Sequence, residues 1–262
     1  SKDANKKNYL AGQFIELYNQ SDKAINVAGL YIGLLESNAT PAYTLDNLHE
    51  KFSDSVVVCK QVFRIPADKA HALKPGESLV ITNSAIDHTA KVATERNLLT
   101  ADYEAKFPTG RIVNNPSTPA LEQKFSSFDK IPNMNLLQSG PCGVVIFRTE
   151  KDVTKFDKVY SYGKTKGSLW LVVPKRYVID GVDILKYNSK SGGADVATKH
   201  LYNDIDGGYA TISAVNGYNG EVVYRKTSTR KGKDGHRILQ DTNNSLNDFK
   251  LSTTINIREY DE

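Results

Sequence analysis

Short runs of apolar and aromatic residues that end in polar turns recur along most of this sequence. In residues 13–18 (QFIELY) apolar and polar positions alternate, and the turn-forming segment NQSD follows directly at residues 19–22. Further runs of this kind cover residues 25–34, 55–65, 78–82, 143–147, 158–162, 168–173, 177–185, 209–214 and 221–224. They are rich in Val, Ile, Tyr and Phe, which favour strands, and are separated by turn-forming residues. Many short strands of this type predict an all-β fold, either a sandwich or a barrel.

Helical patterns are few. Thr44 can cap a short helix in which Leu45, Leu48 and Phe52 share one face. The spacing therefore predicts one helix between the second and third predicted strands.

Residues 84–140 have little strand character and contain two more helical patterns. Thr100 can cap one short helix that includes Tyr103 and Phe107, and Thr118 can cap another. A proline follows Thr118, and proline is common at the first position of a helix. This stretch therefore looks like a partly helical insertion that packs over one end of a sandwich.

The chain shows no internal repeat and no linker rich in Pro, Gly or Ser. We therefore predict a single all-β domain over residues 1–262, with the insertion at about residues 84–140 and long loops.

Composition and charge exclude several classes of protein. The 262 residues can bury a substantial core, and 39% hydrophobic with 24% charged residues is ordinary for a soluble globular protein. The net charge of +4, from 34 basic and 30 acidic residues, is too small to indicate nucleic-acid binding. No apolar run approaches the roughly 20 residues of a membrane helix, and the polar residues 1–7 do not resemble a signal peptide. We therefore expect a chain that begins at a mature or truncated end.

Two cysteines, Cys59 and Cys142, each lie in an apolar run. They are interpreted as two buried thiols, with one disulfide between sheets as the alternative. Neither has metal-ligand spacing to a histidine or to the other cysteine.

Several segments, in order along the chain, resemble those of a lamin-tail domain. The sequences FIELYNQSD at residues 14–22 and INVAGL at 25–30 are similar to its opening strands and hairpin. The segments similar to its later strands are residues 63–66, 73–81, 143–147, 178–182, 223–226 and 241–249. The resemblance implies an immunoglobulin-type β-sandwich.

A plain lamin tail lacks the insertion at residues 84–140. With that insertion, and with residues 132–134 (PNM) and 241–249 as they stand, the chain resembles a group of Bacteroidetes surface lipoproteins of unknown function. Genes of that group often lie beside TonB-dependent outer-membrane transporters. The resemblance implies a position on the extracellular face of the outer membrane, through a lipid anchor absent from this chain. It also implies a transporter and a companion lipoprotein as partners.

No catalytic constellation is visible in the sequence, and the ligand-binding residues stay unknown. There is no Gly-x-Ser-x-Gly motif. The five histidines, none three or four residues from another, are His49, His71, His88, His200 and His236. Sequence spacing therefore provides no metal site, and His88 is interpreted as a satisfied loop residue rather than a ligand or base.

The acidic motifs are weak as well. Asp180 and Asp183 are three apart on a predicted strand, which puts them on opposite faces unless Gly181 marks a bulge. The segment DIDGG at residues 204–208 hints at calcium but lacks the ligand ladder of a calcium loop, so a polar turn is favoured. Calcium is kept as the one cofactor alternative.

The basic residues at 225–237 are interpreted as a solvated hairpin loop, with a contact to an acidic partner or glycan as the alternative. Only Tyr224 is near them, whereas a nucleic-acid site would interleave stacking aromatic residues. Four tyrosines near Gly/Asn-rich loops could either serve recognition or cover the edge of the core. These are Tyr187, Tyr202, Tyr209 and Tyr218.

The sequence is consistent with three alternative functions. The first is a non-catalytic binding or accessory module of an outer-membrane nutrient-uptake complex, with a glycan or peptide as ligand. The second is a secreted hydrolase acting on glycans or peptides, with a deep pocket built from residues 84–140 and the loop near Asp204. The third is a structural or adhesive module, and fold analogy alone does not separate the three.

Overall fold

The structure is a computed structural model that describes residues 1–36, 43–69, 72–106, 112–128, 133–137, 140–213 and 217–261. Strands dominate the fold. The described residues contain two short α-helices, α1 (Leu45–Phe52) and α2 (Ser245–Asp248). No helix among them is both long and apolar enough to span a membrane.

The largest sheet has seven strands, and all their pairings are antiparallel. Six follow the order β10 (Lys158–Tyr160), β11 (Leu169–Pro174), β4 (Val56–Arg64), β3 (Tyr31–Leu35), β9 (Val144–Phe147) and β12 (Val178–Val182). β11 pairs with residues 56–59 of β4, and the seventh strand, β8 (Glu122–Ser126), pairs with residues 61–64 of β4. β4 is rich in Val and is buried along most of its length, as a central strand requires.

A second, open sheet packs against one face of the first. It contains β1 (Phe14–Tyr18), β6 (Ser78–Thr82) and β7 (Tyr103–Glu104). The side chains between the two sheets form one core cluster, which includes Ile32, Leu34, Phe63, Leu79, Ile81 and Tyr103. The alternation of side chains along β3 sends Ile32 and Leu34 into this cluster and Tyr31 and Leu35 to the other face.

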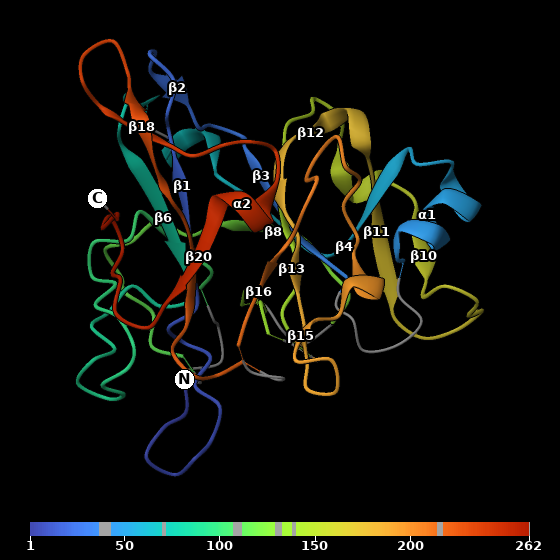
Figure 1. Ribbon diagram of the computed structural model, residues 1–262, viewed down its shortest axis with the longest axis horizontal. Helices are drawn as coiled ribbons and strands as arrows, with labels where there is room; N and C mark the ends of the chain where they lie inside the picture. The colour runs from blue at the N-terminus through green and yellow to red at the C-terminus, as the bar shows by residue number, and fades with distance from the viewer. Residues whose placement is uncertain are drawn as a thin grey trace.

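A second core cluster covers that other face of the large sheet. Leu48 of α1 packs there with Leu171, Val173 and Phe147, and residues 201–205 complete the layer. Figure 1 shows α1 beside β11 and β10, away from β1 and β6. The helix begins after Thr44, whose side chain makes no capping hydrogen bond, and the first helix that the sequence predicts is confirmed.

The remaining elements are short pairs that surround the two sheets. They are β2 (Ile25–Asn26) with β5 (Ala72–Leu73), β13 (Ile184–Leu185) with β16 (Ala210–Thr211), β14 (Tyr187–Asn188) with β15 (Gly193–Ala194), β17 (Val222–Arg225) with β20 (Phe249–Ser252), and β18 (Thr227–Lys231) with β19 (Arg237–Leu239). The 3₁₀ turns are η1 (Ala67–Lys69), η2 (Val153–Lys155), η3 (Lys175–Tyr177) and η4 (Val196–Thr198). In Figure 1 the C-terminal segment, drawn in red, crosses in front of the region between β1 and β12.

The two helices predicted within residues 84–140 are wrong. Tyr103, expected on a helix after Thr100, lies in β7, which pairs in parallel with β6. The residues after Thr118 form β8 on the edge of β4. Pairing with an existing sheet edge satisfies their backbone groups and overrides a weak helical pattern. The described residues of this stretch contain no helix, and they add one strand to each sheet. Phe107 lies outside the described residues.

Candidate functional site

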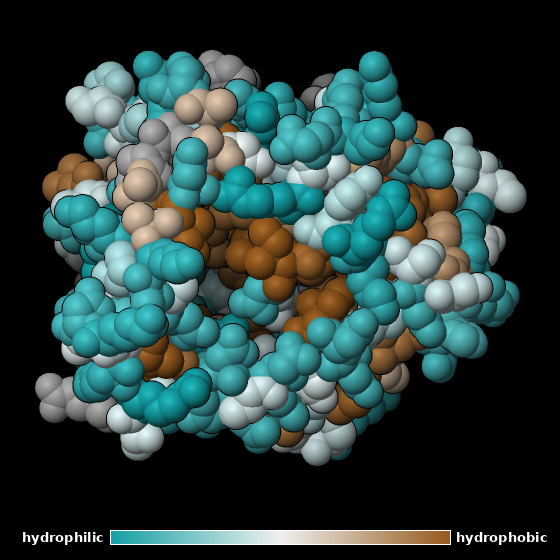
Figure 2. Space-filling model, turned by 90° about the horizontal axis from the view of Figure 1, so that it is seen from above, coloured by the Kyte–Doolittle hydropathy of each residue, from teal (hydrophilic) through white to brown (hydrophobic). Residues whose placement is uncertain are grey.

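A cleft of about 420 Å³ lies where the two sheets end side by side. β1 forms the edge of the small sheet there, and β12, next to β9, forms the edge of the large one. The apolar side chains that line it come from both sheets and from the chain between and after them: Ile15, Leu17, Leu136, Val144, Ile146, Val182, Ile184, Ile212, Val223 and Phe249. Seen from above, the molecule has a hollow with hydrophobic residues inside and hydrophilic residues around its rim (Figure 2).

The cleft exists because the sheets are not fully packed together at this edge. Leu34 and Leu79, deeper between the sheets, are 0% exposed. Ile15, Val144 and Ile146 belong to the same cluster but are only partly buried. Apolar side chains therefore face space that no other described residue fills. Concave, mainly apolar sites of this size are typical of small-molecule binding sites.

The C-terminal wall of the cleft contains residues 222–225 of β17 and Phe249 of β20. Arg225 connects this wall to the large sheet. Its guanidinium forms ion pairs with Asp180 at 3.5 Å, Asp241 at 3.4 Å and Asp248 at 3.7 Å, and lies over the ring of Phe249 at 4.7 Å. The Arg225 side chain is 16% exposed and that of Asp248 is 1% exposed, so solvent screens this pair less than the pairs with Asp180 and Asp241. The three carboxylates thus surround the guanidinium of Arg225.

Asp180 and Asp183 have different partners. Burial raises the pKa of Asp180, and Arg225 partly opposes that shift. Asp183 follows β12, is buried, and accepts hydrogen bonds from the backbone N–H groups of His200 and Leu201 at 2.6 and 2.8 Å. A register shift does occur in β12, but between Val178 and Asp180 rather than at Gly181. Asp183 therefore organises a loop, while Asp180 belongs to the Arg225 cluster.

Glu16 attaches the end of the chain to the β1 side of the cleft. Its carboxylate accepts hydrogen bonds from the backbone N–H of Arg258 and from the hydroxyl of Tyr260, each at 3.0 Å. Tyr18, also on β1, donates to the carbonyl of Arg237 at 2.8 Å. The polar groups on this wall thus hold the C-terminal segment in place.

Asp206, in the segment that hinted at calcium, is buried and bonded to backbone. Its carboxylate accepts from the N–H groups of Gly208, Ser245 and Asp183 at 2.8–3.0 Å. Asp204 pairs with Lys175 at 2.9 Å. These contacts are those of the favoured polar turn. Through Asp206 the turn forms hydrogen bonds both to the residue after β12 and to the first residue of α2. Calcium binding stays an untested alternative.

The cysteines and His88 have structural environments. Both Cys59 and Cys142 are free, buried thiols, and burial raises the pKa of each. His88 shares a hydrogen bond with the Tyr9 hydroxyl through Nδ1 and one with the carbonyl of Ser84 through Nε2, both at 2.8 Å. The interpretation of His88 as a satisfied loop residue is confirmed, while His71 lies outside the described residues.

The basic stretch forms the hairpin of β18 and β19. Arg230, Lys231 and Lys233 are exposed, as a solvated loop predicts. Arg237 is instead tied down, because it donates to Thr227 at 2.8 Å.

The four loop tyrosines have different environments. Tyr202 is 7% exposed and donates to the carbonyl of Val56, so it covers the core. Tyr218 lines the cleft. Tyr187 and Tyr209 are half-buried.

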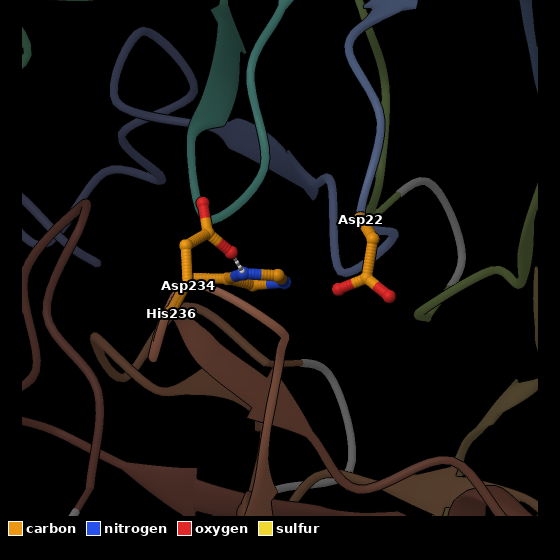
Figure 3. A group of neighbouring side chains, drawn as sticks. All are labelled: Asp22, Asp234 and His236. Carbon is orange, nitrogen blue, oxygen red and sulfur yellow. Dashed lines mark hydrogen bonds and ion pairs between the residues drawn. The ribbon is translucent and has the colours of Figure 1, made fainter.

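One group of three side chains among the described residues could hold a metal ion. Ligand atoms of Asp22, Asp234 and His236 lie within 4.8 Å of one another. Asp22 follows β1, whereas Asp234 and His236 lie in and after the turn between β18 and β19 (Figure 3). Sequence reasoning missed the group because more than 200 residues separate its two halves and no spacing rule connects them.

Two open, face-packed sheets with an apolar cleft at their shared edge define a mostly β protein. The model of the family described as "Protein of unknown function (DUF4876)" matches residues 74–255, and the chain belongs to this family.

A crystal structure of a DUF4876 family protein from Bacteroides thetaiotaomicron VPI-5482 is similar to this chain. The TM-score is 0.75 at 22% sequence identity, and the match covers 95% of this chain and 67% of that one. At this identity the likeness supports the fold alone. No curated protein matches the chain.

Proposed function

We propose that this chain is a non-catalytic binding module that takes a largely apolar small molecule in the cleft between β1 and β12. The observation that carries the proposal is the cleft itself, which has a volume of about 420 Å³ and a mostly apolar lining surface. Burying a ligand there would remove from water the partly exposed faces of Ile15, Val144 and Ile146. A glycan or peptide, the ligand class kept from the sequence, would need an apolar face to fit such a lining.

The polar groups of the cleft support binding over hydrolysis. Asp180 and Asp241 form ion pairs with Arg225, and Glu16 accepts hydrogen bonds from Arg258 and Tyr260. General acid–base chemistry needs a group within reach of a substrate proton, with a pKa tuned for the transfer. These carboxylates instead hold the C-terminal wall, a role that suits a preformed binding site.

We further propose a lamin-tail, immunoglobulin-type relationship and a lipid-anchored position on the extracellular face of the outer membrane. In support, the resembling segments supply β1, β6, β9 and β12, and two sheets pack face to face. The likeness to a Bacteroides protein agrees with the Bacteroidetes resemblance. The role as an accessory to a TonB-dependent transporter rests on that resemblance.

The cleft is tested with N-phenyl-1-naphthylamine, a neutral probe that fluoresces in apolar sites. The wild type is expected to bind the probe saturably. Ile146→Trp places a large ring in the cleft and should abolish the signal, whereas Ile179→Trp should leave it unchanged. Ile179 is the matched control because it lies on the neighbouring strand β12 but is 55% exposed and outside the cleft.

Val223→Trp, on the C-terminal wall, repeats the test if Ile146→Trp unfolds the protein, as monitored by circular dichroism. Equal binding by wild type and a folded cleft variant would overturn the proposal. If all three variants and the wild type fail to bind the probe, the proposal is also wrong.

The proposed extracellular position and the proposed accessory role are tested on intact cells that carry the natural protein. Surface proteolysis is expected to degrade it, and a pull-down from native membranes is expected to recover a transporter subunit. Protection from protease would exclude the extracellular position. Recovery without a transporter subunit would exclude the accessory role.

A further inference from the structure

The group Asp22, Asp234 and His236 lies outside the contacts proposed for the cleft ligand and joins two distant segments. The backbone N–H of Lys233 donates to the carboxylate of Asp22 at 3.0 Å and links the two segments at this point. The Lys233 ammonium is 3.9 Å from the same carboxylate but 86% exposed, so it adds little attraction. Two carboxylates therefore approach one imidazole at this point.

His236 is held in one orientation. Its side chain is 8% exposed, and its Nδ1 lies 2.7 Å from Asp234. The ring fills the space above Gly232, where any side chain would collide with it. The other nitrogen, Nε2, points toward Asp22 in Figure 3 and is 3.4 Å from the carbonyl oxygen of Gln20. A distance of 3.4 Å is long for a hydrogen bond, but two ligands of one metal ion are commonly this far apart.

We propose that these residues form a binding site for a divalent transition-metal ion such as Zn²⁺. The ligands are Nε2 of His236 and the carboxylate of Asp22, with the Gln20 carbonyl beside them. Asp234 is a positioning residue, because a carboxylate on Nδ1 fixes the tautomer and orientation of a metal-binding histidine. Imidazole and carboxylate donors suit Zn²⁺, whereas Ca²⁺ prefers oxygen ligands alone.

Ion binding would clamp the β18–β19 hairpin to the loop after β1. Gln20 also lines the cleft, so the clamp would fix one part of the cleft rim. This inference does not depend on the proposed ligand, because the clamp is built from groups that the cleft proposal does not use.

Isothermal titration of Zn²⁺ into the full chain tests the site. The wild type is expected to bind one ion, and Asp22→Asn and His236→Gln are each expected to weaken binding about tenfold or more. His49→Gln is the matched control. His49 shares the same kind of hydrogen bond with Asp54, at 2.8 Å, but belongs to no group of three ligands among the described residues.

Hydrogen–deuterium exchange of the hairpin gives a second readout. Zn²⁺ is expected to slow exchange at residues 231–237 in the wild type and in His49→Gln, but not in Asp22→Asn. The inference is wrong if the wild type binds no ion, or if both ligand variants bind as tightly as the wild type. Equal weakening in His49→Gln would also overturn it, because it would indicate non-specific surface binding.

Discussion

Glu36 is a residue whose ionisation depends on the fold. It follows β3, is 1% exposed, and accepts a hydrogen bond from the backbone N–H of Tyr43 at 2.7 Å. Burial raises the pKa of Glu36 from 4.5 to about 7, and the bonds from Tyr43 and Ser161 only partly oppose the shift. Ser161 is in turn held by the indole N–H of Trp170 at 2.8 Å.

The raised pKa of Glu36 predicts a pH-dependent stability. Between pH 4.5 and about 7 the folded state binds this proton more tightly than the unfolded state does. The free energy of unfolding should therefore fall as pH rises through this window, by about 3 kcal/mol in total, and stay level above it. Urea unfolding of wild type and Glu36→Gln, at intervals from pH 4.5 to 8, measures the difference. A wild-type curve parallel to that of the variant would contradict the prediction.

At the scale of single elements, β3 depends on a residue without a side chain. A Cβ at Gly33 would lie 2.9 Å from Sγ of Cys59 and 3.0 Å from Cγ2 of Val145. These neighbours belong to β4 and β9, which flank β3 in the middle of the large sheet. The side chains of Cys59 and Val145 can pack over β3 as they do only because position 33 has no side chain.

Gly33→Ala should therefore destabilise the protein by about 1–3 kcal/mol through overpacking. Gly193→Ala is the matched control, since Gly193 also lies in a strand but has no atom within 4 Å of its Cβ position. The control should change the free energy of unfolding by less than about 0.5 kcal/mol. Guanidinium unfolding of both variants checks this, and equal effects would show that the space around Gly33 is not decisive.

The elements also show where sequence patterns succeed. The predicted strands at β1, β6 and β9 are confirmed within a residue, and so is α1, because alternation, turn residues and a one-faced helix are local features. β7 and β8 were missed. Their sequences are short and weakly patterned, and the edges of β6 and β4 decide their conformation.

For the whole molecule, the large sheet connects the two core clusters. β3, β4 and β9 contribute side chains to both, for example Tyr31 to one and Ile32 to the other. Loss of either cluster would expose one face of the same strands. We therefore expect residues 1–262 to unfold as one cooperative unit, as the single-domain prediction from the sequence requires.

Leu79→Ala tests this coupling. Leu79 packs between the sheets, whereas Trp170, the only tryptophan, lies in the cluster on the other face. The substitution should cost about 2–5 kcal/mol and lower the midpoint seen by Trp170 fluorescence as much as that seen by far-ultraviolet circular dichroism. Two separate transitions, or a shift in circular dichroism alone, would contradict a single unit.

The sequence by itself determined the β-rich class, most strands of the two sheets, α1 and the buried state of both cysteines. Each of these depends on neighbouring residues, through the period of two along a strand, turn chemistry or an apolar run. Tertiary structure alone decided the cleft, the Arg225 cluster and the group around His236. Their members are far apart in the sequence, in the group around His236 by more than 200 residues. Only the packing of the two sheets with the C-terminal segment brings them together.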